Sequence, residues 1–182
     1  MYATILLGLI LSFMPPASRV KPMFLTKSAE LTLFSEAPIE NIEAVSKSAY
    51  GVINSANGEI QFGVSIRSFR FRKSLMQEHF NENYMESEKF PAAKFKGKLN
   101  IPIDISKDGE YSVVATGDLE VHGITKKRTI TGTIKVLNGR LEVNSVFDVK
   151  CRDHEIKIPA LVFKNIAETI RITLKGTFST VN

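Results

Sequence analysis

The sequence predicts an all-β protein, an antiparallel up-and-down β-barrel of about eight strands with one short helix inserted between two of them. Apolar and polar residues alternate along most of the chain, which is typical of strands that bury one face. Asn-Gly and Asp-Gly pairs separate several of these runs and favour tight hairpin turns. A β-sandwich fits the same strand count. Glycines inside the runs favour the barrel, because its closure needs bends: Gly63, Gly97, Gly117, Gly132 and Gly176.

The strands are expected in a regular succession. Two less regular strands come first, followed by six clearly alternating runs. Together they are 26–34, 42–53, 60–66, 94–103, 111–121, 130–136, 141–149 and 170–178. Hairpin turns are expected at Asn57-Gly58, Asp108-Gly109 and Asn138-Gly139, because these pairs tolerate the positive φ angles of a tight turn. Most neighbouring strands are therefore expected to be antiparallel.

One segment breaks the alternation and predicts a short amphipathic helix. Ser74 and Gln77 have the spacing of a capping box, with Ser74 as the N-cap. The apolar residues that follow recur at helical spacing up to Met85. The helix is expected over an open end of the barrel or along its wall. Its Met and aromatic side chains suit either an adaptable lid or ordinary core.

Length and charge narrow the class of protein. The chain has 182 residues, enough for one domain with a sizeable core. Its one cysteine excludes an intramolecular disulfide. The net charge of +5 is modest, and the basic groups do not alternate with aromatic residues, so no nucleic-acid partner is expected.

The N-terminal segment predicts export. Residues 3–14 are uncharged and almost wholly apolar, too short to span a bilayer but typical of a signal peptide. Two prolines and the small residues Ala17 and Ser18 follow, so we expect a signal peptide at 1–18 and a mature domain at 19–182 without an integral membrane segment. The mature protein would be periplasmic or secreted. A buried N-terminal strand or helix is the alternative.

Several motifs, in order, resemble the YceI-like family, also described as polyisoprenoid-binding or lipid-binding. The most specific is 117–127, GDLEVHGITKK, which is similar to the family's G-x-L-T-I-H-G-V-T-K segment. Upstream, His79-Phe80, Tyr84-Met85 and 88–95, EKFPAAKF, resemble its H-L, F-F and E-K-Y-P-x-x-x-F series, and Asp153–Ile156 and Ile166–Ile170 resemble its last hairpin. The resemblance spans about 25–178. It implies a lipocalin-like barrel with an apolar tunnel for a long isoprenoid or similar lipid, and a periplasmic or secreted location.

The inner faces of the strands are then the candidate ligand-binding site, because apolar contact alone can hold a long chain. Any one of these residues is also compatible with ordinary core. The candidates are Phe62, Val64, Ile66, Phe95, Leu99, Val113, Ala115, Ile130, Ile134, Val143, Phe147, Ile170 and Ile172, with Leu75, Met76, Phe80 and Met85 near the opening.

Three further groups of residues have side chains that are capable of chemistry or of binding a charged partner. His122 is expected at a strand-to-turn junction, bonding backbone groups or a ligand head group. Cys151 with His154 could form a nucleophile, although strand alternation would separate them. Lys94, Lys96 and Lys98, and the run Lys126–Arg128, are expected on solvated faces, with an anionic surface as the alternative.

The sequence thus predicts an exported protein that binds a long-chain isoprenoid, a quinone tail or a similar fatty lipid, for carriage or sequestration. We expect no enzyme, catalytic residue, metal or cofactor, because no metal-ligand spacing occurs and histidines are few. The alternative is a structural or stress-related barrel whose lumen is filled by side chains and which acts through its surface. Whether the protein forms a homodimer is left open.

Overall fold

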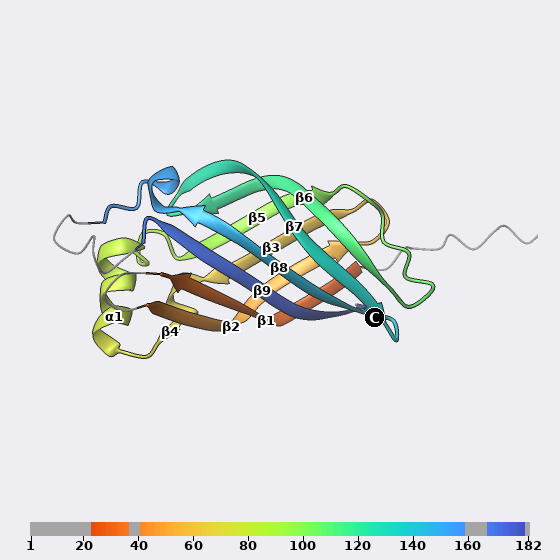
Figure 1. The fold of residues 1–182 in the computed structure, drawn as a ribbon, viewed down its shortest axis with the longest axis horizontal. Helices are drawn as coiled ribbons and strands as arrows, with labels where there is room; N and C mark the ends of the chain where they lie inside the picture. The colour runs from red at the N-terminus through yellow and green to blue at the C-terminus, as the bar shows by residue number, and fades with distance from the viewer. Residues whose placement is uncertain (1–22, 37–40, 159–166, 181–182) are drawn as a thin grey trace, which may run out of the picture.

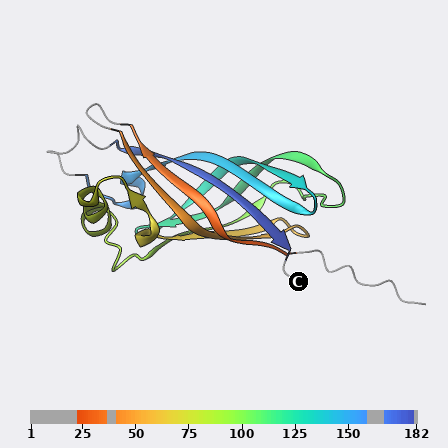
Figure 2. The same cartoon turned by 90° about the horizontal axis from the view of Figure 1, so that it is seen from below.

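The computed structural model describes residues 23–36, 41–158 and 167–180, which form an elongated β-barrel with a short helix at one end (Figure 1). The strands run along the long axis, and Figure 2 shows the helix at the same end from a second direction. The strands are β1 (Met23–Ser35), β2 (Ile42–Asn54), β3 (Glu59–Ser65), β4 (Arg70–Phe71), β5 (Ala92–Leu99), β6 (Gly109–Val121), β7 (Ile124–Leu137), β8 (Arg140–Lys150) and β9 (Thr169–Thr180). The helical segments are η1 (Ile66–Ser68), α1 (Ser74–His79), the π-helical turn η2 (Phe80–Tyr84) and η3 (Cys151–His154).

The predicted barrel is confirmed. Among the described residues every strand pairing is antiparallel, and the order is β1-β9-β8-β7-β6-β5-β3-β2. β1 also pairs with β2, so the eight long strands close on themselves. β4 is a two-residue strand that pairs only with Ala44 and Val45 of β2. Closure leaves the eight strands without a free sheet edge along most of their length.

The expected turns formed only in part. Asn138 and Gly139 have φ angles of 50° and 72° and join β7 to β8 as the sequence predicted. At Asn57-Gly58, only Gly58 has a positive φ, because the loop from β2 to β3 spans four residues. The prediction of a tight turn at Asp108-Gly109 is wrong, because Asp108 ends a nine-residue loop. The carboxylate of Asp108 accepts a hydrogen bond from the backbone N–H of Asn138.

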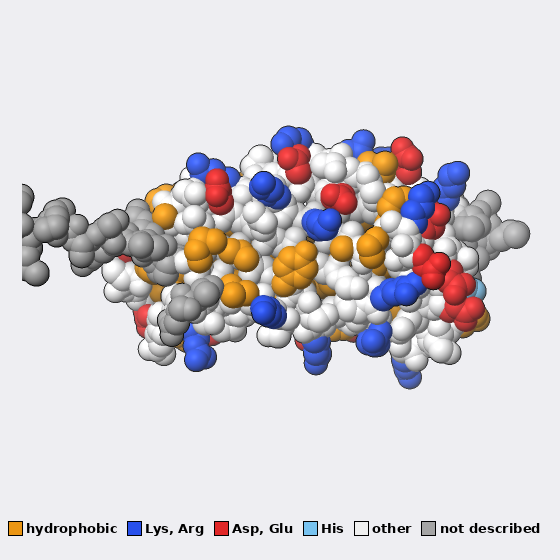
Figure 3. Space-filling model, turned by 180° about the vertical axis from the view of Figure 1, so that it is seen from behind, with side chains coloured by type: hydrophobic (Ala, Val, Ile, Leu, Met, Phe, Trp, Pro, Cys, Tyr) orange, Lys and Arg blue, Asp and Glu red, His pale blue; other side chains and the backbone are white. Residues whose placement is uncertain are grey.

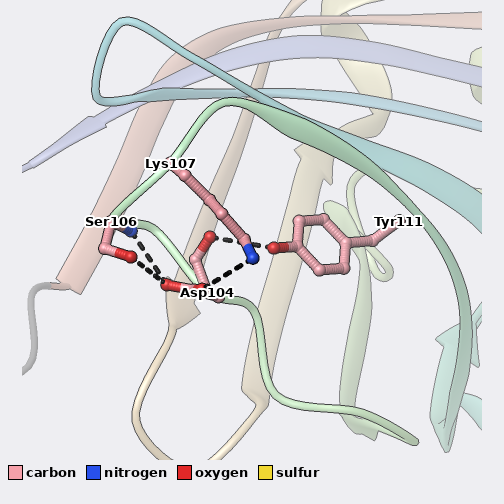
Figure 4. A network of polar contacts seen from close by, with 4 residues as sticks. All are labelled: Asp104, Ser106, Lys107 and Tyr111. Atoms are coloured by element: carbon pink, nitrogen blue, oxygen red, sulfur yellow. Dashed lines mark hydrogen bonds and ion pairs between the residues drawn. The ribbon is translucent and has the colours of Figure 1, made fainter.

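That loop, residues 100–108, closes one end of the barrel. The strand expected at 94–103 ends at Leu99, and Ile103 is buried in the core instead of continuing the alternation. A polar network holds the loop in shape (Figure 4). The Asp104 carboxylate accepts from the Ser106 backbone and hydroxyl and pairs with Lys107, and the Tyr111 hydroxyl donates to the Asp104 carbonyl at 3.0 Å.

The helix begins at the predicted place, but the capping box is wrong. Lys73 is the N-cap, and no side chain caps the helix. The side chain of Gln77 accepts a hydrogen bond from the backbone N–H of Phe71 in β4, so it is not available to the N-terminus of the helix. α1 is followed directly by the π-helical turn, which ends at Tyr84.

The interior is most tightly packed at the end opposite α1. Phe24, Leu141 and Phe178 are fully buried there, and the Phe178 ring makes an edge contact with Phe62 at 5.7 Å between ring centroids. Phe24, Leu141 and Phe178 lie in the halves of β1, β8 and β9 that are furthest from the helix. This half of the barrel is therefore filled by its own side chains.

A close approach of two strands requires glycine at one place in the wall. Gly97 of β5 and Gly117 of β6 face each other, and a Cβ at Gly117 would overlap the Lys96 carbonyl oxygen and the Gly97 Cα. We expect Gly117→Ala to lower the free energy of unfolding by about 2 kcal/mol, measured by urea denaturation. Gly109→Ala is the control, since its Cβ would meet nothing closer than the Tyr111 ring at 3.9 Å. Equal effects of the two variants would contradict this account.

Candidate functional site

Two adjoining cavities occupy the half of the barrel nearest α1 and the middle of the barrel. The larger, which we call the mouth cavity, has a volume of about 530 Å³ and is lined by α1, η2 and the adjacent ends of the strands. The smaller, which we call the inner cavity, has a volume of about 120 Å³ and lies deeper among the strands. Both are lined mainly by hydrophobic side chains. The mouth cavity falls within the range of ligand pockets, roughly 300–1,000 Å³.

The two cavities share part of their lining. Leu31, Val64, Ala93, Leu119 and Phe147 line both, so these residues form the junction between them. They come from β1, β3, β5, β6 and β8, and therefore surround the lumen. A chain-like ligand would lie along the barrel axis and pass this junction.

The structure brings all the predicted site residues to the lining of these cavities. Their role as ligand contacts stays a prediction. Ile66, Leu75, Met76, Phe80, Met85, Ile170 and Ile172 line the mouth cavity. Phe62, Phe95, Leu99, Val113, Ala115, Ile130, Ile134 and Val143 line the inner cavity, and Val64 and Phe147 line both.

Sequence reasoning missed other lining residues. Leu31, Leu33, Leu119 and Val121 belong to recognised strands, and the alternation could have identified them. Phe69 and Phe71 carry no such signal, because Phe69 lies between η1 and β4 and Phe71 belongs to β4, which has only two residues. Both contact Phe80 of η2, at 5.8 and 4.9 Å between ring centroids. This aromatic cluster packs η2 against the barrel beside the mouth cavity.

Polar side chains of the mouth cavity lie mostly on the helical segment. Lys73, His79 and Tyr84 line it there, Ser35 lines it from the end of β1, and Cys151 lines it from η3. Lys73 and His79 are exposed, and partial burial raises the pKa of Tyr84. Leu75 is 59% exposed although it also lines the cavity, so α1 presents an apolar side chain at the rim.

His122 lies at a strand-to-turn junction, as predicted, and joins three segments. Its Nδ1 donates to the carbonyl of His154 in η3 at 3.1 Å, and its Nε2 lies 2.8 Å from the Glu86 carboxylate after η2. Its ring packs edge-on against Phe90. A carbonyl can only accept, so the Nδ1 side of the ring is the donor in the bond to His154. His122 lines neither the mouth cavity nor the inner cavity, and its two hydrogen bonds connect the β6–β7 turn with η3 and with the segment after η2.

His154 is a buried histidine whose protonation opposes folding. Its Nδ1 donates to the Ile124 carbonyl at 3.0 Å, and burial lowers its pKa from 6.5. The unfolded chain therefore binds the proton more tightly than the folded one, and stability falls as the pH drops below about 6.5. We expect His154→Asn, which keeps a donor near the Nδ1 position, to reduce the slope of the unfolding free energy against pH, by at most about 1.4 kcal/mol per pH unit.

The measurement is urea denaturation of each protein between pH 7.5 and 5. The exposed His79 provides the control variant, His79→Gln, which is expected to keep the wild-type slope. An unchanged slope in His154→Asn would show that other groups account for the acid sensitivity.

Cys151 is poorly suited to act as a nucleophile. Burial, with the negative charge of Glu168, raises the pKa of its thiol from 9.0 to about 11. His154 is on the same short segment, but its ring is bound to Ile124. We expect the native protein to resist a disulfide-exchange reagent at pH 8, where the thiol is protonated. The same protein in guanidinium should titrate one thiol within minutes. Rapid labelling of the native protein would contradict this.

Most of the basic side chains lie on solvated faces, as predicted, but Arg128 is partly buried because it pairs with Asp153 of η3. Lys94, Lys96 and Lys98 are exposed along β5, and Lys127 pairs with Asp118 at 2.9 Å. Figure 3 shows basic and acidic side chains interspersed over the face opposite Figure 1. An interspersed surface of this kind provides no continuous positive field.

A family model for the YceI-like domain matches residues 18–178. The chain belongs to the YceI-like family. This confirms the resemblance of the motifs, and the strongest of them, 117–127, spans the end of β6, the turn at His122-Gly123 and the start of β7. No curated protein matches the chain.

Solved structures share the fold of this YceI-like domain at low sequence identity. A polyisoprenoid-binding domain from Saccharophagus degradans aligns with a TM-score of 0.71 and 16% identity, covering 88% of this chain and 99% of the other. Burkholderia cenocepacia BcnA aligns at 0.70 and 14%, covering 84% and 96%. The Campylobacter jejuni YCEI protein aligns at 0.62 and 13%, covering 81% and 89%.

In the described part of the chain, no three His, Cys, Asp or Glu side chains are grouped so that they could hold a metal ion. Nor does any helix within 23–36, 41–158 or 167–180 have the length and apolar character to cross a membrane. The predicted signal peptide at 1–18 lies outside the described residues.

Proposed function

We propose that this YceI-like domain binds a long-chain isoprenoid, a quinone tail or a similar amphipathic lipid inside the barrel and carries or sequesters it. The observation that supports this most directly is the pair of adjoining apolar cavities along the barrel axis. Each methylene group buried there contributes about 0.8 kcal/mol, so a long chain needs no specific polar contact. The printed name of the Saccharophagus degradans protein, a polyisoprenoid-binding domain, supports the same class of ligand.

Binding, and not catalysis, is the activity that these cavities suit. Their lining is mainly hydrophobic, and the thiol of Cys151 has a raised pKa. A catalytic site needs titratable groups that converge on a reacting atom. The alternative function, action through the surface, assumes a lumen filled by side chains. Only the half of the barrel around Phe24, Leu141 and Phe178 is filled in this way.

Native mass spectrometry of the exported protein tests the proposal. The expected result is a complex with one lipid, which organic extraction releases for mass analysis. The apo protein should take up a polyprenol or a quinone with a long tail. A protein that is purified without lipid and takes up neither probe would overturn the proposal and favour action through the surface.

We also propose that the protein is exported after removal of residues 1–18. The support is the uncharged apolar run at 3–14, followed by Pro15, Pro16 and two small residues. Intact-mass measurement of the protein from culture medium or periplasm should show a chain that begins at Arg19. Recovery of the full chain from the cytoplasm would contradict export.

A further inference from the structure

β7 and β8 separate from each other along half of their length. β7 pairs with β6 at thirteen positions, from Gly109↔Val136 to Val121↔Ile124, and β8 pairs with β9 at ten. β7 and β8 pair at only six, and the pairing stops at Gly132↔Ser145. Beyond this point the two strands separate, as the middle of Figure 1 shows. We call residues 129–131 of β7 and 146–149 of β8 the β7–β8 fork.

Side-chain interactions close both ends of the fork. At its apex, the Ser145 hydroxyl donates to the Thr131 carbonyl at 2.6 Å. At its far end, Arg128 of β7 pairs with Asp153 of η3 at 2.6 Å. His154 of η3 also bonds the Ile124 carbonyl. Between these two interactions the strands lack backbone pairing over three residues of β7, a length of about 10 Å.

The inner cavity reaches this interval. Its lining includes Ile130 and Thr131 from β7 and Asn144, Ser145 and Phe147 from β8. Thr131 and Asn144 are exposed to solvent as well, so residues at the apex of the fork touch both the cavity and the outside. Val146, in the fork itself, is 55% exposed, so the outer face of the fork carries an apolar side chain.

β2 and β3 also diverge from each other, but other segments of the chain fill the gap between them. β2 and β3 pair only from Tyr50↔Gly63 to Ile53↔Ile60. The space beyond is occupied by η1 and by β4, which pairs with Ala44 and Val45 of β2. Ser46 and Ser68 hydroxyls are bonded there at 2.7 Å. In the described residues, no such segment lies in the β7–β8 fork between its apex and η3.

The two ends of the barrel differ. Ile103 and the filled core close one end, and α1 with η2 lies over the other, where Phe80 packs against Phe69 and Phe71. At the α1 end, a chain reaches the inner cavity only through the mouth cavity, past the helical segment that this aromatic packing holds against the barrel. Passage at the fork requires no loss of backbone hydrogen bonds between 129–131 and 146–149, because none pair those two segments.

We propose that the β7–β8 fork is a side portal, through which the apolar chain of the ligand enters and leaves the inner cavity. This inference rests on the proposed lipid-binding function. The fork places side chains of Ile130 and Phe147 on the path from outside to the cavity, and the apolar Val146 at its outer rim. Local separation of two strands that are already unpaired opens the path.

The test is a reversible cross-link across the fork. Thr131→Cys with Val146→Cys places two thiols on the outer face, one residue beyond the last pair Gly132↔Ser145. Cys151 stays in place, because it is buried. The control, Asp148→Cys with Arg171→Cys, joins two exposed partners of β8 and β9 that are already paired. In each double variant the two thiols are joined either by oxidation to a disulfide or by a short bis-maleimide.

Stopped-flow fluorescence measures uptake and release of a polyene fatty acid, and equilibrium titration measures its Kd. The fork cross-link is expected to slow both rates about tenfold with little change in Kd, and the control cross-link should change neither. Full-speed exchange in the cross-linked protein would overturn the portal and indicate the α1 end, while binding itself persists. Absence of binding in the wild-type protein would overturn the lipid-binding function and the portal with it.

A second variant acts in the opposite direction. A Cβ at Gly132 would lie 2.7 Å from the Asn144 carbonyl oxygen, so Gly132→Ala pushes the strands apart at the apex. Ser145→Val removes the bond to Thr131 there without adding bulk to the backbone. Each is expected to speed release about threefold or more, whereas Gly109→Ala should not. Unchanged release in both variants would contradict the portal.

Discussion

Ala93→Trp is expected to exclude long chains from the inner cavity while the mouth cavity stays open to short ones. Ala93 lines both cavities at their junction, and an indole there occupies the path between them. If about four methylene groups lose their burial, the loss is about 3 kcal/mol, roughly 200-fold in Kd. The Kd of a polyprenol should rise by this factor, and that of a chain short enough for the mouth cavity should change little.

The control for this variant is Lys96→Trp, which places the same side chain on the outer face of the same strand. Circular dichroism and urea denaturation establish that both variants are folded. Equal losses for long and short chains would contradict a continuous path along the axis. So would a wild-type affinity of Ala93→Trp for the polyprenol.

Phe178→Ala is expected to lower the free energy of unfolding by about 3–5 kcal/mol. Phe178 is fully buried at the filled end, in edge contact with Phe62, and its removal leaves a cavity in a close-packed region. Since small domains are stable by roughly 5–15 kcal/mol, this loss is a large part of the total. The measurement is urea denaturation of the lipid-free protein.

Phe147→Ala provides the matched comparison. Phe147 is also an inward-facing phenylalanine, but it borders both cavities and is only partly buried, so fewer contacts are lost. We expect a smaller loss of stability, about 1–2 kcal/mol, together with weaker lipid binding. A larger loss of stability in Phe147→Ala than in Phe178→Ala would contradict the division of the barrel into a filled half and a hollow half.

Local sequence patterns determined the wall of the barrel. Side chains alternate between the two faces of a strand, so the runs through Ile60, Val113 and Ile134 identify inward-facing residues without any knowledge of their partners. Asn138-Gly139 determined one hairpin, because its φ angles are a property of the two residues themselves. The motif at 117–127 is also a local pattern, so it indicated the family without any knowledge of the tertiary structure.

Predictions failed where a local pattern competed with a tertiary partner. Gln77 has the spacing of a capping box, but its side chain bonds the backbone of β4. Asp108-Gly109 has the composition of a turn, but the Asp108 carboxylate bonds Asn138, from another loop. Ile103 continues an alternation, but it plugs the end of the barrel. In each case the deciding partner is far away in the sequence.

The sequence alone therefore determined that this chain is an antiparallel barrel of the YceI-like family and which side chains point inward. The tertiary structure decided which of those side chains fill space and which border a cavity, because that depends on the distance between opposite walls. It also decided where pairing between β7 and β8 stops, since β8 alternates beyond Ser145 as regularly as before and the polar run 125–129 of β7 does not mark the break at Gly132. Alternation reports the face of a residue, whereas a cavity and a fork depend on the separation of strands, which no local pattern records.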